Sequence, residues 1–181
     1  MIRKLTVLVL CAAGFAAFGT TANATLFSYE KQGDPINGRI HGECGYQCAT
    51  AWYRAGSGNS GTNGCLKYNW LPNGYYTVRA HYDHYDFTIK GRAWWLSDYY
   101  CSSTGVTRDE LFVHTEETAD QGQACGSPYI EAYCWDGEGD YYSVGCIKVR
   151  RRPVDPDGTS HIGKLDNFVH SWGAATNVWV N

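Results

Sequence analysis

The chain has 181 residues, of which 44% are hydrophobic, 15% aromatic and 18% charged, and it contains 21 Gly and 8 Cys. The low charge and high aromatic content exclude an intrinsically disordered chain, and a length of about 100–200 residues is typical of one domain. A formal net charge of −3 and a pI near 6.0 argue against nucleic acid as a partner.

The N-terminus has the three parts of a secretory signal peptide. A short basic start is followed by an apolar run over residues 5–18 and by a small-x-small cleavage site that ends at Ala24. The run is shorter than the roughly 20 residues that a membrane-spanning helix requires. We therefore predict that residues 1–24 are removed on export. Residues 25–181 should then form one domain without a membrane span, either secreted or held in the periplasm or cell wall.

Cleavage also changes the number of cysteines. It removes Cys11 and leaves seven, an odd number, in an oxidising compartment where thiols tend to pair. One cysteine is therefore expected either to stay free for chemistry or to pair with another molecule. If one stays free, the other six can form three bridges, with the connectivity left open. The separation of Cys44 and Cys48 differs from that of redox and zinc motifs, so both are expected to be disulfide halves. The six are Cys44, Cys48, Cys65, Cys101, Cys125 and Cys134.

Short strands dominate the predicted secondary structure. The clearest lies at residues 74–82, where side chains alternate between a more apolar and a more polar face. In chain order, strands are expected at residues 25–29, 51–54, 74–82, 87–89, 93–96, 111–113, 146–149 and 178–180, with a turn at 90–92. Only residues 165–170 have a helical pattern, and residues 33–64 otherwise favour loops. The pattern predicts a mainly β fold, a compact β-sandwich or barrel with little helix.

The residues around Cys146 favour a reactive thiol. Gly145 permits a sharp backbone turn that can aim consecutive N–H groups at an oxyanion beside the sulfur. Lys148 and the arginines at 150–152 place positive charge nearby, which favours the thiolate. A cysteine nucleophile also requires a base, usually histidine.

These residues carry a family resemblance. The segment Ser143-Val-Gly-Cys146-Ile-Lys-Val, preceded by a strand that ends in His-Thr, resembles the catalytic motif of the L,D-transpeptidases of bacterial cell walls, the YkuD-type domain. Residues 71–78 look like the lead-in to a strand of that family, and residues 108–114 look like the strand that carries its histidine. The resemblance covers roughly residues 50–155. It implies an exported enzyme that acts on peptidoglycan stem peptides and uses neither a cofactor nor a metal.

The resemblance also implies roles for individual residues. Cys146 would be the nucleophile and His114 its general base, with the carbonyl of Thr115 orienting the imidazole. The N–H groups of Gly145 and Cys146 would stabilise the oxyanion. Ser143 corresponds to the motif serine and would shape the turn.

Lys148 or Arg150 would meet the substrate carboxylate.

Two departures from the family place the chain on a divergent branch. Val144 stands where the common motif has histidine, giving Ser-Val-Gly-Cys. In addition, His114 precedes Cys146 by 32 positions, more than is usual in the family. The extra segment contains Cys125 and Cys134, and we interpret it as a disulfide-pinned insertion at the rim of the site.

Two other functions compete with this hypothesis. One is a non-catalytic, disulfide-stapled module that binds wall glycan or a partner protein, for which 7 Trp and 14 Tyr offer stacking surfaces. The other is a secreted antibacterial effector of the same fold. A metal site at His81 and His84 is not expected, because residues three apart on one strand point to opposite faces, and a solvated hairpin end is preferred.

Overall fold

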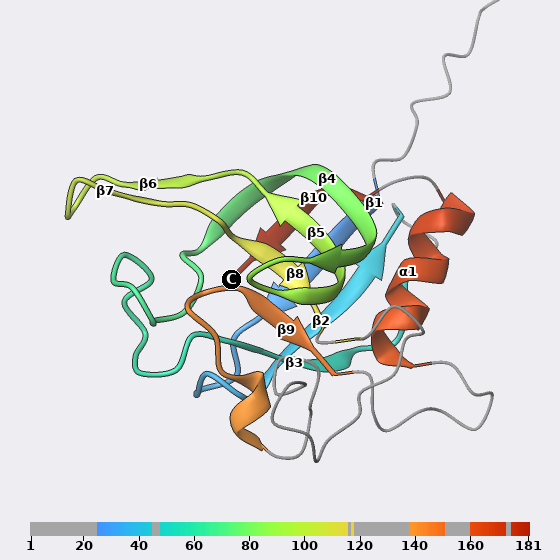
Figure 1. Ribbon diagram of the computed structural model, residues 1–181, viewed down its shortest axis with the longest axis horizontal. Helices are drawn as coiled ribbons and strands as arrows, with labels where there is room; N and C mark the ends of the chain where they lie inside the picture. The colour runs from blue at the N-terminus through green and yellow to red at the C-terminus, as the bar shows by residue number, and fades with distance from the viewer. Residues whose placement is uncertain (1–24, 45–47, 116, 118–137, 151–159, 173–174) are drawn as a thin grey trace, which may run out of the picture.

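The structure is a computed structural model that describes residues 25–44, 48–115, 117, 138–150, 160–172 and 175–181 (Figure 1). The predicted signal peptide, Cys125, Cys134 and the arginines at 151 and 152 lie outside the described residues.

Eight strands form a closed barrel in the order β1-β10-β4-β5-β8-β9-β3-β2 (Figure 1). The β1–β10 and β8–β9 pairs are parallel and the other pairs are antiparallel. The barrel confirms the prediction of a mainly β fold. The strands are β1 (Thr25–Glu30), β2 (Gly38–Glu43), β3 (Tyr53–Ser57), β4 (Gly74–Asp86), β5 (Lys90–Leu96), β8 (Phe112–His114), β9 (Ile147–Val149) and β10 (Ala175–Val180).

A two-stranded ribbon, a 3₁₀ helix and an α-helix lie outside the barrel wall among the described residues. A two-stranded ribbon of β6 (Tyr99–Cys101) and β7 (Val106–Arg108) projects from the barrel between β5 and β8 (Figure 1). A short 3₁₀ helix, η2 (Glu138–Tyr141), precedes the loop that leads into β9. Strands β2, β6 and β7 were not expected from the sequence, and β3 begins two residues after the start of the strand predicted at 51–54.

The β4–β5 hairpin differs from the prediction. Residues 87–89 form the turn, and β5 begins at Lys90, where the turn was expected. The N–H of Phe87 donates to the carbonyl of Ile89 at 3.2 Å, which closes the turn. Phe87 is 73% exposed at the tip, so apolar character here does not mark a buried strand. Gly91, at φ +88°, adopts a conformation that favours glycine.

Alternate residues of the barrel strands fill its interior. Trp94 on β5 packs edge-on against Phe27 on β1, with their ring centroids 5.1 Å apart. Apolar burial of this kind contributes about 25 cal/mol per Å² of area removed from water. Fully buried side chains of this core include Phe27, Tyr29, Ile40, Leu71, Tyr76, Trp94, Leu96, Val113, Ile147, Val149, Val178 and Val180.

Helix α1 (His161–Trp172) packs on β2 and contains the helical stretch predicted at 165–170. Ser160 caps its N-terminus, because its hydroxyl accepts from the N–H of Gly163 at 3.0 Å. Gly42 on β2 permits the close approach: a Cβ at this position would lie 2.6 Å from Cδ1 of Phe168. Among the described residues, no helix is both long and apolar enough to cross a membrane.

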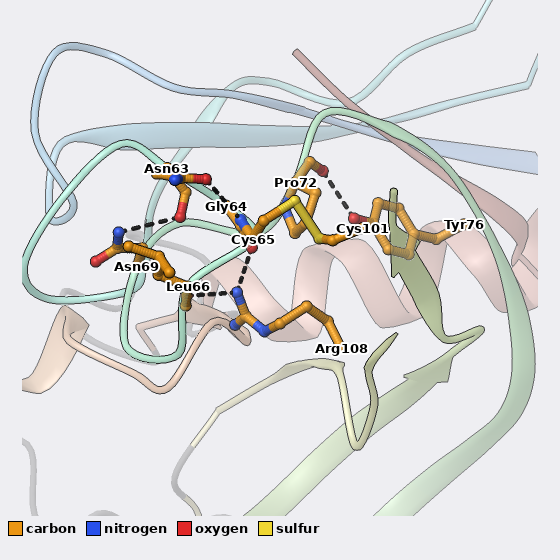
Figure 2. The surroundings of a disulfide bond; sticks show 9 residues. All are labelled: Asn63, Gly64, Cys65, Leu66, Asn69, Pro72, Tyr76, Cys101 and Arg108. Carbon is orange, nitrogen blue, oxygen red and sulfur yellow. Dashed lines mark hydrogen bonds between the residues drawn. A yellow bond between two sulfur atoms is a disulfide. The ribbon is translucent and has the colours of Figure 1, made fainter. Parts of the chain in front are cut away.

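Two disulfides join described cysteines, Cys44 to Cys48 and Cys65 to Cys101. The second ties the loop before β4 to the end of β6 (Figure 2). Cys146 takes part in neither bridge. Four of the six cysteines predicted to pair are therefore accounted for, and the other two lie outside the described residues.

Replacing both Cys65 and Cys101 by serine should lower the free energy of unfolding by about 2–4 kcal/mol, because the bridge restricts a long loop of the unfolded chain. Urea denaturation followed by tryptophan fluorescence measures this difference. Ser102→Ala, on the exposed turn next to the bridge, is the matched control and should change stability by less than about 0.5 kcal/mol. Equal stability of the double variant and the wild type would contradict the assignment.

Candidate functional site

A cleft of about 660 Å³ opens on the outer face of β8 and β9. Val113 and Ile147 point into the barrel core, so the residues that alternate with them face outward. The β4–β5 hairpin curves across this face in Figure 1. The cleft is lined by Phe112, His114, Cys146 and Lys148 from the two strands and by Tyr82, Tyr85, Phe87 and Ile89 from the hairpin.

Strand register brings the predicted base and nucleophile to the same face. His114 pairs with Lys148 across the parallel β8–β9 ladder, and Cys146 lies two residues before Lys148. Cys146 and His114 are therefore diagonal neighbours, a relation that separates Cα atoms by about 7–8 Å and lies within reach of long side chains. The structure thus brings Cys146, His114 and Lys148 together at one cleft.

Gly145 provides the turn that precedes the thiol. Its φ is +122°, in the region that side chains rarely adopt, as expected for a glycine that aims the next residue. A Cβ here would also collide with Nη2 of Arg108. Both the backbone conformation and the neighbouring guanidinium therefore require glycine at this position.

The carbonyls of three successive residues in the turn are fixed by side chains. Nη2 of Arg108 donates to the carbonyl of Val144 at 2.8 Å, and the Ser57 hydroxyl donates to that of Gly145 at 3.0 Å. The Ser143 hydroxyl donates to the carbonyl of Cys146 at 2.6 Å. The orientation of the peptide planes around the thiol is thereby set by Arg108 and Ser57 from outside the turn and by Ser143 from within it.

Ser143 shapes the turn as the sequence motif implies. Its oxygen accepts from the N–H of Gly58 at 2.9 Å and from the N–H of Gly145 at 3.0 Å. The Gly145 amide is thus engaged within the loop, which argues against the oxyanion role expected for it. The Cys146 N–H belongs to the same peptide group as the Gly145 carbonyl, which accepts from the Ser57 hydroxyl. In a planar trans peptide the N–H and C=O point in opposite directions, so the Cys146 N–H points away from Ser57.

The Cys146 thiol is 9% exposed and donates weakly to the carbonyl of Glu110 at 3.6 Å. Glu110 has a φ of +50°, uncommon for a residue other than glycine. Such strained residues cluster at functional sites. The contact holds the sulfur at the junction between the ribbon and β8.

Arg108 is a buried cation beside the thiol. It is 6% exposed, and besides Val144 it donates to the carbonyls of Gly64 and Leu66, on either side of Cys65 (Figure 2). Burial lowers the pKa of Arg108, whereas the negative charges that Tyr76, Cys146 and Asp109 acquire on ionisation raise it. Because the guanidinium remains protonated in proteins, it favours the thiolate form of Cys146.

His114 is buried and neutral at physiological pH. Burial, followed by the charge of Lys148, lowers its pKa from 6.5 to about 3, and a backbone hydrogen bond with Thr115 acts in the opposite direction. Thr115 is itself fully buried, and its N–H donates to the carbonyl of Arg92 at 3.2 Å. The imidazole is therefore unprotonated and able to accept a proton, although its lowered pKa makes it a weaker base than an exposed histidine.

The remaining predicted residue, Arg150, follows β9 and is not among the residues that line the cleft. Sequence reasoning missed Arg108, Ser57 and the tyrosines of the hairpin. Tyr82 and Tyr85 both line the cleft, although they are three residues apart, because the β4–β5 register shifts between them.

The chain matches no protein-family model, no curated protein and no solved structure.

Replacing Arg108 by methionine should lower the free energy of unfolding by about 2–4 kcal/mol, because three buried carbonyls lose a charged donor. It should also raise the pKa of the Cys146 thiol, measured from the pH dependence of iodoacetamide alkylation. Arg79→Met is the matched control: Arg79 forms an exposed ion pair with Asp98 at 2.9 Å, worth about 0–1 kcal/mol. An equal loss in both variants would contradict the bridging role of Arg108.

Burial of His114 predicts acid sensitivity. Since its folded pKa lies below the unfolded value, the unfolded chain binds the extra proton between pH 6.5 and about 3. Stability should therefore fall as the pH falls through this window, by up to about 1.4 kcal/mol per pH unit from this residue. Urea titrations at several pH values should show a shallower slope for His114→Gln. The exposed His84→Gln is the control and should keep the wild-type slope; identical slopes for all three proteins would contradict the assignment.

Proposed function

We propose that the protein is an exported cysteine-nucleophile enzyme of the L,D-transpeptidase type, acting on peptidoglycan stem peptides. The observation that carries the proposal is the position of Cys146, His114 and Lys148 on one face of β8 and β9, along a single cleft. The Gly145 turn and the hydrogen bonds that fix it supply the preorganisation that acyl transfer requires.

The first half of the reaction forms an acyl-enzyme. The neutral imidazole of His114 accepts the thiol proton as the Cys146 sulfur attacks the carbonyl carbon of the third residue of the stem. The Cys146 N–H stabilises the oxyanion of the tetrahedral intermediate. As that intermediate collapses, the peptide bond breaks, His114 returns the proton to the leaving nitrogen, and the terminal D-amino acid departs. A thioester remains on Cys146.

The second half releases the acyl group. An amine from a neighbouring stem attacks the thioester carbonyl, and His114 carries its proton to the departing sulfur. The product is a 3–3 crosslink, and the thiol is restored. Water in place of the amine gives a carboxylic acid, which is L,D-carboxypeptidase trimming.

The walls of the cleft suit a peptide with an acidic end. Lys148 places an ammonium group beside the nucleophile, where it can pair with a substrate carboxylate. The hairpin rings of Tyr82 and Tyr85 cover the apolar side, and Tyr85 packs on Phe112 with ring centroids 5.3 Å apart.

Exposed aromatic rings around the cleft favour a second candidate, a non-catalytic wall-binding module. Tyr68, Phe87 and Tyr142 line the cleft and are 47%, 73% and 42% exposed. Rings of this kind stack on sugars. Such a module would bind glycan without consuming stem peptide, so the two candidates differ in whether a product forms.

Incubating the purified mature protein with tetrapeptide muropeptides tests the proposal. Mass spectrometry should show release of the terminal D-amino acid together with trimmed or dimeric products. Cys146→Ala should lower the rate by at least about 10³-fold, because no nucleophile remains. Tyr100→Ala, at an exposed residue on β6 that does not line the cleft, should retain the wild-type rate.

Two results would overturn the proposal. One is the absence of product under both reducing and non-reducing conditions. The other is alkylation of unreduced protein that labels no thiol at Cys146. Retained binding to purified cell wall that is weakened by Phe87→Ala, without any product, would instead support the binding module.

A further inference from the structure

Four side chains from β4 and α1 converge at a second site, and none of them lines the cleft that contains Cys146. We call them the β4–α1 cluster. Each offers one nitrogen or oxygen ligand atom, and these four atoms lie within 4.8 Å of one another. The members are His81, Asp83, Asp166 and His170.

The spacing of each pair fits the element that carries it. His81 and Asp83 are two apart on a strand and share one face, while Asp166 and His170 are four apart on a helix and also share one face. The expectation of a solvated hairpin end is wrong for His81, whose side chain is only 22% exposed. Its ring stacks on Trp94 at a centroid distance of 4.9 Å.

The centre of the cluster is buried and polar. Nε2 of His81 lies 3.0 Å from Oδ1 of Asp166 and 3.8 Å from Oδ1 of Asp83. Asp166 is 9% exposed. Nε2 of His81 and Oδ1 of Asp166 are both buried and within hydrogen-bond distance of each other, so they form a buried histidine–carboxylate pair. Asp83 and His170 add two further ligand atoms at the exposed edge of this pair, and together the four are donors that a metal ion can use.

The surroundings orient these groups as outer-shell residues orient metal ligands. The guanidinium of Arg92 is shared between two carboxylates: Nη1 lies 3.6 Å from Oδ2 of Asp166, and Nε lies 3.6 Å from Oε2 of Glu117. With Oδ2 of Asp166 on Arg92, its other oxygen, Oδ1, is the one next to His81. Nδ1 of His170 lies 2.9 Å from the backbone oxygen of Asp166. This contact holds the imidazole of His170 beside Asp166, whose Oδ1 lies 3.8 Å from the same nitrogen.

We propose that the β4–α1 cluster binds one divalent metal ion of the zinc type and thereby fastens α1 to β4. Two imidazoles and two carboxylates are ligands that zinc accepts, and they offset its charge. A tetrahedral ion with bonds of about 2.0–2.2 Å spaces its ligand atoms roughly 3.4 Å apart, within the range of contacts in the cluster. By holding His81 and Asp83, the ion would also fix the backbone of Tyr82 between them. Tyr82 lines the cleft, so the ion would help to position one wall of that site.

Isothermal titration of chelator-treated protein with zinc chloride tests the site. The Cys146→Ser background is used so that the thiol cannot contribute a ligand. One equivalent of zinc should bind, and Asp83→Asn and His170→Ala should each weaken binding at least about tenfold. These side chains are 85% and 60% exposed, so the fold should tolerate both changes. Zinc should raise the midpoint of thermal unfolding of the Cys146→Ser protein. It should not raise that of a variant that also carries both Asp83→Asn and His170→Ala.

His84→Ala is the matched control, since His84 is an exposed histidine on the same strand outside the cluster, and it should leave the affinity unchanged. The proposal is overturned if no zinc binds. It is also overturned if neither ligand variant weakens binding, or if His84→Ala weakens it as much as they do.

Discussion

The buried guanidinium of Arg108 is the constraint on which the candidate site depends. Its planar fork of donors spans carbonyls that are remote in sequence, those of Gly64 and Leu66 on one side and that of Val144 on the other. The first two flank Cys65, so the disulfide to Cys101 and the cation fix the same loop. A lysine would offer a point charge without this geometry. The position of the nucleophile loop is thus tied to the ribbon and to the loop before β4, neither of which belongs to the barrel wall.

The barrel supplies what Arg108 cannot, namely the spacing between His114 and Cys146, the proposed base and nucleophile. Val113 and Ile147 are fully buried in the core, and the parallel register of β8 and β9 carries this rigidity to the residues that alternate with them. Sites built on strands are held more precisely than sites on loops. The position of His114, on β8, is therefore fixed by core packing. Cys146 immediately precedes β9, and its position is fixed mainly by the turn. The proposed acyl transfer needs both at once, and the two supports meet at Ser57, a barrel residue of β3 whose hydroxyl donates to the carbonyl of Gly145 in the turn.

Local patterns in the sequence predicted the parts of this arrangement that local physics decides. The alternation in β4, the mainly β class and the sharp turn at Gly145 follow from neighbouring residues. The turn at 87–89 could not be predicted, because the apolar residues Phe87 and Ile89 gave the pattern of a buried strand. In the structure these two side chains line the cleft. The role of Arg108 was equally hidden. Its partners lie 36 to 44 positions away, and only the closed barrel brings them together.

The β4–α1 cluster was missed for a related reason. Sequence reasoning compared His81 with His84, which lie on the same strand, whereas the partners that matter come from a helix more than eighty positions later. Because side chains alternate along β4, His81 and Asp83 face α1 while Tyr82 faces the cleft. One strand therefore carries both the cluster and a wall of the candidate active site. Any force that fixes His81 and Asp83 also restricts the backbone of Tyr82. The packing of α1 on β4 therefore affects the position of the hairpin beside Cys146 through Tyr82.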